Sequence, residues 1–82
     1  MARVSKANAA RVRRAFPPGQ ADEALAVLAL FGDATWHRDT DRVHAAILEL
    51  AAGDLDALWS LVDAAYRDWR DVLWWASKPP HS

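Results

Sequence analysis

The chain has 82 residues, a formal net charge of −1, five tryptophans and no cysteine. This length allows one small domain, and the lack of cysteine excludes disulfides and thiolate metal sites. No apolar run is long enough to cross a bilayer, and no continuous hydrophobic segment typical of a secretory signal stands at the N-terminus. Because strand-type alternation is absent, we expect an all-α protein, a small bundle of three to four helices.

The charge is unevenly distributed. Residues 1–19 carry five basic side chains and no acidic one, whereas residues 20–82 carry five basic and eleven acidic ones. We therefore divide the chain into a basic arm or helix over 1–19, a helical domain over 20–77 and a tail over 78–82. The arm could bind an anionic partner, lie against its own acidic domain, or stay solvated. Its basic residues are Arg3, Lys6, Arg11, Arg13 and Arg14.

The arm has only a thin apolar face, so residues 2–15 are either a weak helix or a disordered arm that orders on contact. Pro17-Pro18-Gly19 ends it, because proline lacks an N–H group. The Arg-rich, acid-free composition also resembles an organellar transit peptide, but a cytoplasmic bacterial protein is the simpler interpretation. The positions that form the thin face are Val4, Ala7, Ala10/Arg11 and Ala15.

A second helix is expected from about Gln20 to Phe31. Every residue from Ala24 to Phe31 is apolar, and a short helix that is apolar all round belongs in the middle of a small core. Gly32 suits its C-terminal cap.

A third helix is expected from about Thr40 to Ala52, with Asp39 and its neighbours as N-cap candidates. His44 and Leu48, four residues apart, share one of its faces. Gly53 and Asp54 then form a helix–turn–helix hinge. The main apolar face is Val43, Ala46, Ile47 and Leu50.

The segment from Leu55 to about Ala76 is helical by its apolar spacing, which places one buried stripe along it. Its continuity stays open. The unbroken phase favours one helix, whereas Asp68 followed by Asp71 is a variant of the capping box and favours a break near 67–68. The predicted stripe is Leu55, Leu58, Trp59, Val62, Ala65, Tyr66, Trp69, Val72, Leu73 and Ala76.

Trp74 and Trp75 fall outside this stripe and need cover from another side. They are either core residues that cap the stack of helices or anchors of a protein interface, since tryptophan and arginine dominate interface hot spots. On a continuous helix, Arg67, Arg70 and Trp74 would lie close together. We therefore name a candidate interface that also includes one loop residue: Trp74, Trp75, Arg67, Arg70 and Trp36.

Residues 42–76 resemble small uncharacterised bacterial helical proteins. In these an Ala-Ile-Leu-x-Leu helix is followed by Gly-Asp and then by an Asp-(Tyr/Trp)-Arg-Asp-Val-Leu motif. Here the first part reads Ala46-Ile47-Leu48-Glu49-Leu50, with Glu49 in place of an expected lysine, and the last part reads Asp68-Trp69-Arg70-Asp71-Val72-Leu73. Ser77-Lys78-Pro79 also departs from the Glu-Tyr-Pro of that pattern. The resemblance implies a shared helical fold and no catalytic or ligand-binding residue.

Residues for catalysis are sparse. His37 and His44 are seven apart and lack the i, i+4 spacing of a helical metal pair, no serine stands in a glycine elbow, and no glycine-rich phosphate loop exists. Asp41 and His44 could meet on one helix face, without a third ligand. We therefore expect no enzyme, no cofactor and no metal.

The favoured function is a protein-interaction module that binds a protein partner or forms a homodimer. The alternative is an accessory nucleic-acid-binding protein that uses the basic arm, and we expect no membrane partner.

Overall fold

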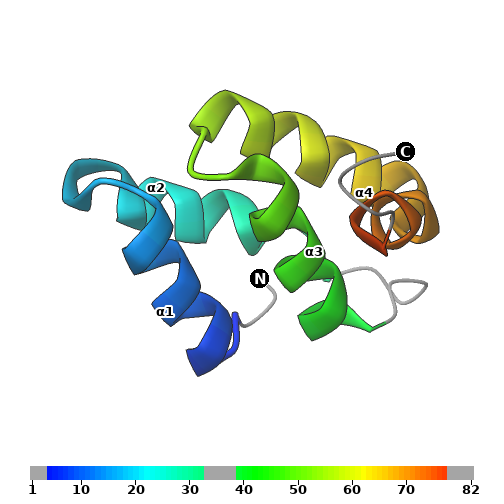
Figure 1. The fold of residues 1–82 in the computed structure, drawn as a ribbon, viewed down its shortest axis with the longest axis horizontal. Helices are drawn as coiled ribbons and strands as arrows, with labels where there is room; N and C mark the ends of the chain where they lie inside the picture. The colour runs from blue at the N-terminus through cyan, green and yellow to red at the C-terminus, as the bar shows by residue number, and fades with distance from the viewer. Residues whose placement is uncertain (1–3, 33–38, 78–82) are drawn as a thin grey trace.

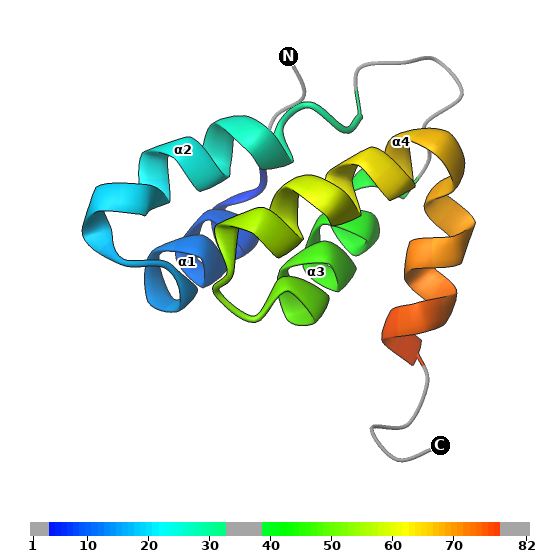
Figure 2. The same cartoon turned by 90° about the horizontal axis from the view of Figure 1, so that it is seen from above.

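The computed structural model describes residues 4–32 and 39–77, which form four helices and no strand. α2 and the first part of α4 lie side by side, α3 packs most closely on α4, and α1 contacts α2 and α3 (Figures 1 and 2). The predicted all-α class and small bundle are confirmed. The predicted tail over 78–82 lies outside the described residues. The helices are α1 (Lys6–Ala15), α2 (Pro18–Leu28), α3 (Thr40–Ala51) and α4 (Leu55–Ser77).

α1 is a helix that packs into the fold. Its packed face recurs every four residues, at Val4, Asn8, Val12 and Phe16, and the last three of these are at most 3% exposed. Steps of four place side chains one above another along a helix. The predicted face was wrong except for Val4, because the position of α2 and α3 decides which side of α1 is covered. The positions that the structure leaves exposed instead are Ala7, Ala10, Arg11 and Ala15.

Two hydrogen bonds fix the start of α1. The Ser5 hydroxyl accepts from the Asn8 backbone N–H at 3.2 Å and so caps the helix. The buried Asn8 side chain donates through Nδ2 to the carbonyl oxygen of Asp41 at 3.0 Å. This second bond joins the N-terminal turns of α1 and α3.

α2 begins and ends earlier than expected. It begins at Pro18, because the ring of a proline in the first turn already has a helical φ and its missing N–H is not needed there. It ends at Leu28, and the next residues form tighter i to i+3 bonds, from Leu30 N–H to the Val27 carbonyl at 3.1 Å and from Phe31 N–H to the Leu28 carbonyl at 3.2 Å. The C-cap is Ala29. The sequence had suggested Gly32 for this position.

The prediction that this apolar segment occupies the middle of the core holds only in part, since Val27, Leu28 and Phe31 are at most 2% exposed but other positions are not. Ala26 and Leu30 are exposed, the latter at 41%, and the largest helix–helix contact joins α3 to α4. α2 covers one side of that pair, so its outer face has no helix to pack against in this chain. An apolar residue such as Leu30 is therefore left at the surface.

The α3–α4 turn is close to its expected position, since α3 ends at Ala51. Ala52 and Gly53 both adopt left-handed conformations, and Asp54 caps α4 by accepting the N–H groups of Asp56 at 2.9 Å and Ala57 at 3.3 Å. Gly53 packs against the end of α1: a Cβ built on it would lie 2.6 Å from the carbonyl oxygen of Ala15. Only glycine fits this turn without a shift of the backbone.

At the other end of α3, Asp39 is the N-cap residue, as expected, but its side chain makes no capping hydrogen bond. It has a left-handed φ of 50° and its carboxylate lies 3.9 Å from the Arg42 guanidinium. Because both side chains are more than half exposed, this ion pair adds little to stability.

α4 is broken at Asp68, which resolves the question of continuity in favour of a break. Asp68 has φ −156° and ψ 97°, outside the helical region, and its carboxylate accepts the Arg70 N–H at 3.1 Å as an N-cap does. The last part of α4 consequently turns sharply and runs away from α2 (Figure 2).

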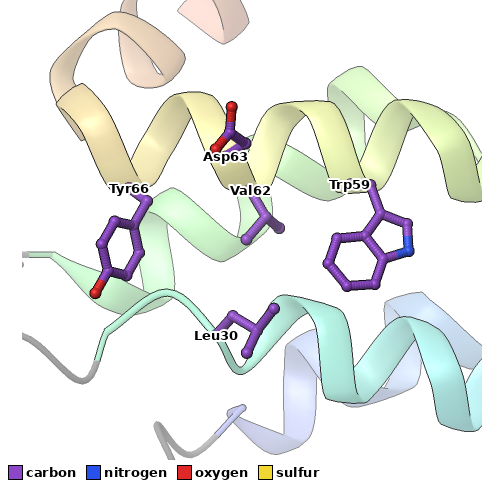
Figure 3. Close-up of a pocket in the computed structure, with 5 residues that line it drawn as sticks. All are labelled: Leu30, Trp59, Val62, Asp63 and Tyr66. Carbon is purple, nitrogen blue, oxygen red and sulfur yellow. The ribbon is translucent and has the colours of Figure 1, made fainter.

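The predicted stripe along α4 is buried only in part. Leu58, Val62, Ala65 and Val72 are at most 3% exposed and belong to the core. Trp59 and Tyr66 were placed in the same stripe, but they lie at its edge and are 48% and 49% exposed. The predicted burial of these two rings is therefore wrong. Figure 3 shows Trp59 opposite the last turns of α2 and Tyr66 beyond the end of that helix, and neither ring is enclosed.

Candidate functional site

A groove of about 350 Å³ lies between the end of α2 and the first part of α4. Its lining is mainly apolar, and we call it the aromatic groove. Figure 3 shows Trp59, Val62 and Tyr66 pointing from α4 towards the segment that carries Leu30. The lining residues are Leu30, Trp59, Val62, Asp63 and Tyr66.

Helix geometry explains the shape of the groove. Trp59 and Tyr66 are seven residues apart, so two helical turns place them on one face about 10 Å apart along the axis. Val62 lies between them and is 3% exposed, which makes it the floor. Leu30 closes the opposite wall. Three of the five large hydrophobic side chains that are exposed in the described part of the chain thus meet here.

The charges beside the groove are paired. The Asp63 carboxylate forms an ion pair with the Arg67 guanidinium one turn further along α4, and both side chains are largely exposed. Figure 3 shows Asp63 directed away from the side of α4 that bears the rings. Besides Asp63, the groove offers the Tyr66 hydroxyl and the Trp59 indole N–H as polar groups, and the rest of its lining is suited to apolar side chains.

The predicted interface is spread over both parts of α4. Trp74 and Trp75 are 59% and 41% exposed and lie on the last part. The expected proximity of Arg67 and Arg70 assumed a continuous helix, but the break at Asp68 falls between them. Each pairs locally, Arg67 with Asp63 and Arg70 with Asp68 at 3.3 Å. The fifth predicted residue, Trp36, lies outside the described residues.

The basic residues of α1 line up on its solvent side. At 100° per residue, Lys6, Arg13 and Arg14 lie within about 60° of the direction opposite the buried Val4–Phe16 face, and Arg11 flanks that face. All four are exposed, and none is in an ion pair within residues 4–32 and 39–77. Arg3 lies outside the described residues.

His44 serves packing. It is fully buried, and its Nε2 donates to the Phe31 carbonyl oxygen at 3.1 Å, while Nδ1 has no hydrogen-bond partner among the described residues. Burial lowers the pKa of His44 below its ordinary value, against weaker opposing effects that include the Phe31 carbonyl and the Asp41 carboxylate. The ring is thus neutral at pH 7 and ties α3 to the turn after α2.

Metal chemistry finds no support in the described part of the chain, where no three His, Cys, Asp or Glu residues gather closely enough to hold an ion. His37 lies outside it. Among the described helices, none combines the length and the hydropathy required of a membrane span.

Sequence reasoning missed the aromatic groove. It assigned Trp59 and Tyr66 to the core stripe and Leu30 to a central helix. One signal was present: the run from Ala24 to Phe31 holds more apolar side chains than a single short helix can bury in so small a protein.

The resemblance of residues 42–76 to small bacterial helical proteins stays a prediction. Comparisons with family models, with curated proteins and with solved structures find no match to this chain.

Proposed function

We propose that the protein is a non-enzymatic protein-interaction module and that the aromatic groove is its principal binding surface. The observation that carries this proposal is the convergence of Leu30, Trp59 and Tyr66, each between 41% and 49% exposed, on one apolar depression. Tryptophan and tyrosine are the residues most enriched among interface hot spots, because they remove a large apolar area from water with little loss of rotamer freedom.

The lining favours a protein segment over a small molecule. Small-molecule sites combine apolar walls with several convergent polar groups that fix the orientation of the ligand. Here the polar groups are the Asp63 carboxylate, which is already paired with Arg67, and the Tyr66 hydroxyl and Trp59 indole N–H, each of which belongs to a large apolar ring. Apolar anchor side chains of a protein need no such groups, because the surrounding backbone contacts orient them.

A cytoplasmic location in a bacterium is part of the same proposal. The lack of cysteine supports it, since small secreted domains commonly depend on disulfides.

A capture experiment tests this function. The tagged chain and a Trp59→Ala variant are incubated with cell extract to which the untagged chain has been added, and the retained proteins are compared. Ser60→Ala is the matched control, because Ser60 is an exposed neighbour that does not line the groove. We expect at least one protein that is retained by wild type and Ser60→Ala and lost with Trp59→Ala. Identical sets for all three chains would overturn the proposal.

A second candidate function rests on α1. Its solvent face carries Lys6, Arg13 and Arg14 without an ion pair among the described residues, which is the arrangement that contacts phosphates without reading bases. Binding to a DNA duplex should then weaken steeply with salt and be lost in an Arg13→Gln/Arg14→Gln variant. Affinity that is unchanged by this double substitution would exclude the arm as a nucleic-acid surface.

A further inference from the structure

The aromatic groove lies between two helices that run in the same direction. α2 and the first part of α4 are side by side, and the chain follows the same course in both (Figures 1 and 2). A third helix that lies along such a pair packs against both walls. Its side chains at i and i+7 are about 10 Å apart on one face, which is also the spacing of Trp59 and Tyr66 along α4. The geometry of the groove therefore suits a helical occupant.

The two walls carry an excess of negative charge. Residues 18–28 and 54–67 hold five acidic side chains and one basic side chain, a net charge of −4. The basic one, Arg67, is already paired with Asp63. The other four acidic side chains have no ion pair within the described ranges 4–32 and 39–77, and the basic residues of α1 do not line the groove. These four are Asp22, Glu23, Asp54 and Asp56.

Two of these carboxylates lie at the same end of the groove, one on each wall. Trp59 is opposite the last turns of α2, and Tyr66 lies beyond them (Figure 3). Asp56 is about one turn before Trp59 on α4, and Glu23 is about two turns before Leu30 on the other wall. Because the two helices run in the same direction, Asp56 and Glu23 both lie towards the end of the groove that is nearer the helix N-termini. Both side chains are exposed, so a partner can reach them.

We propose that the groove binds a basic amphipathic helix of another protein. Its apolar side chains contact Trp59, Val62 and Tyr66, and its lysine or arginine side chains lie beside Glu23 and Asp56. This inference rests on the proposed function, because it names the class of partner that the same surface binds. Complementary charges steer association and suppress wrong partners. A helix with the same apolar face and an acidic rim would bring like charges against both carboxylates and is thereby selected against.

The apolar and the charged contacts contribute differently to binding. Glu23 and Asp56 are exposed, so each ion pair with a partner should raise the affinity by about 3-fold at low salt, and by less when salt screens the charges. Loss of a hot-spot aromatic side chain such as Trp59 weakens binding by about 30-fold. The rings should therefore provide most of the affinity, and the carboxylates should provide the preference for a basic partner.

Three synthetic peptides test the class of partner. Each is about 18 residues long, which is enough to form a helix, and all three share one leucine face with i, i+3, i+4 and i+7 spacing. Their remaining positions are lysine in the first peptide, glutamine in the second and glutamate in the third. Isothermal titration calorimetry with the full chain gives the dissociation constants. At low salt we expect the lysine peptide to bind about 10-fold more tightly than the glutamine peptide, and the glutamate peptide to bind most weakly. Added salt should reduce these differences.

Two double variants locate the charge effect. Glu23→Gln/Asp56→Asn should weaken binding of the lysine peptide by about 10-fold and leave binding of the glutamine peptide unchanged. Glu49→Gln/Asp71→Asn is the matched control, because it removes the same charge from exposed positions that do not line the groove. Trp59→Ala should weaken binding of both peptides by about 30-fold. Far-UV circular dichroism of each variant should match that of wild type. The indole N–H signal of Trp59 in the NMR spectrum of wild type should also shift when the lysine peptide is added, which tests the contact without a substitution in the groove.

The outcomes separate the class of partner from the proposed function. If the glutamine or glutamate peptide binds as tightly as the lysine peptide and depends equally on Trp59, the groove binds protein but the basic partner is wrong. If the control pair weakens binding as much as Glu23→Gln/Asp56→Asn does, net charge and not the end of the groove is responsible, and the inference fails. It also fails if no peptide binds, and the proposed function is then judged by the capture experiment alone. A shift of the Trp59 signal with protein concentration in the absence of peptide would indicate a second copy in the groove and overturn the inference as well.

Discussion

Replacing Gly53 by alanine tests how closely α1 packs on the α3–α4 turn. Gly53 has a φ of 82°, and a Cβ on it would lie 2.6 Å from the Ala15 carbonyl oxygen. The left-handed conformation costs a residue with a Cβ about 1–2 kcal/mol. Extra atoms forced into a packed contact typically cost about 1–3 kcal/mol more. The expected loss of about 2–5 kcal/mol is a large part of the roughly 4–12 kcal/mol that stabilises a domain of this length.

Thermal unfolding followed by far-UV circular dichroism measures this loss. We expect Gly53→Ala to lower Tm by about 10 °C or more. Gly19→Ala is the matched control, because Gly19 lies in the first turn of α2 with no atom within 4 Å of a built Cβ. There alanine should stabilise the fold by about 0.4–1 kcal/mol. A Tm for Gly53→Ala within about 2 °C of wild type would show that the turn and α1 are not in close contact.

Three further substitutions follow from single interactions. Asp54→Ala removes the N-cap of α4 and should cost about 1 kcal/mol in urea unfolding, whereas an unchanged midpoint would mean that the cap is dispensable. Asn8→Leu removes the hydrogen bond from the buried Asn8 amide to the Asp41 carbonyl and should cost about 0.5–1.5 kcal/mol by the same measurement; equal or higher stability would contradict this role. Burial lowers the pKa of His44 in the folded chain, so the unfolded chain takes up its proton first as the pH falls. The contribution of His44 to stability should therefore be complete above pH 6.5 and decline below it. His44→Gln, which keeps a donor but does not titrate, should have a flatter profile of Tm against pH, and matching profiles would refute this assignment.

Local signals were enough to predict the last three helices and most helix ends, whereas residues 2–15 were left open between a weak helix and a disordered arm. Proline marked the boundary between the first two helices, and Gly53 with Asp54 marked the turn before α4. At Asp68 two signals disagreed. The capping-box variant predicted a break in the helix, whereas the regular apolar spacing predicted one continuous helix. The choice between the two depends on whether the residues after Asp68 pack better in another direction, which the spacing along one helix does not reveal.

The aromatic groove could not be predicted in the same way, because it depends on where neighbouring helices end. Trp59 and Tyr66 fit the period of a buried face, but Trp59 lies opposite the last turns of α2, Tyr66 lies beyond them, and both rings stay about half exposed. The last helical residue of α2 is Leu28, and the tighter turn that follows places Leu30 opposite the rings without covering them. Burial at the edge of a stripe is therefore set by tertiary contacts and not by periodicity.

The break at Asp68 also divides α4 into two units that can open separately. Residues 69–77 include one fully buried side chain, Val72, and their helical hydrogen bonds are not continuous with those of the preceding part. Local unfolding from this end can stop at Asp68 without loosening the core residues Leu58 and Val62. Amide hydrogens after the break should accordingly exchange with solvent faster than those before it, so the C-terminal unit can adjust its position at low cost while the rest of the fold stays intact.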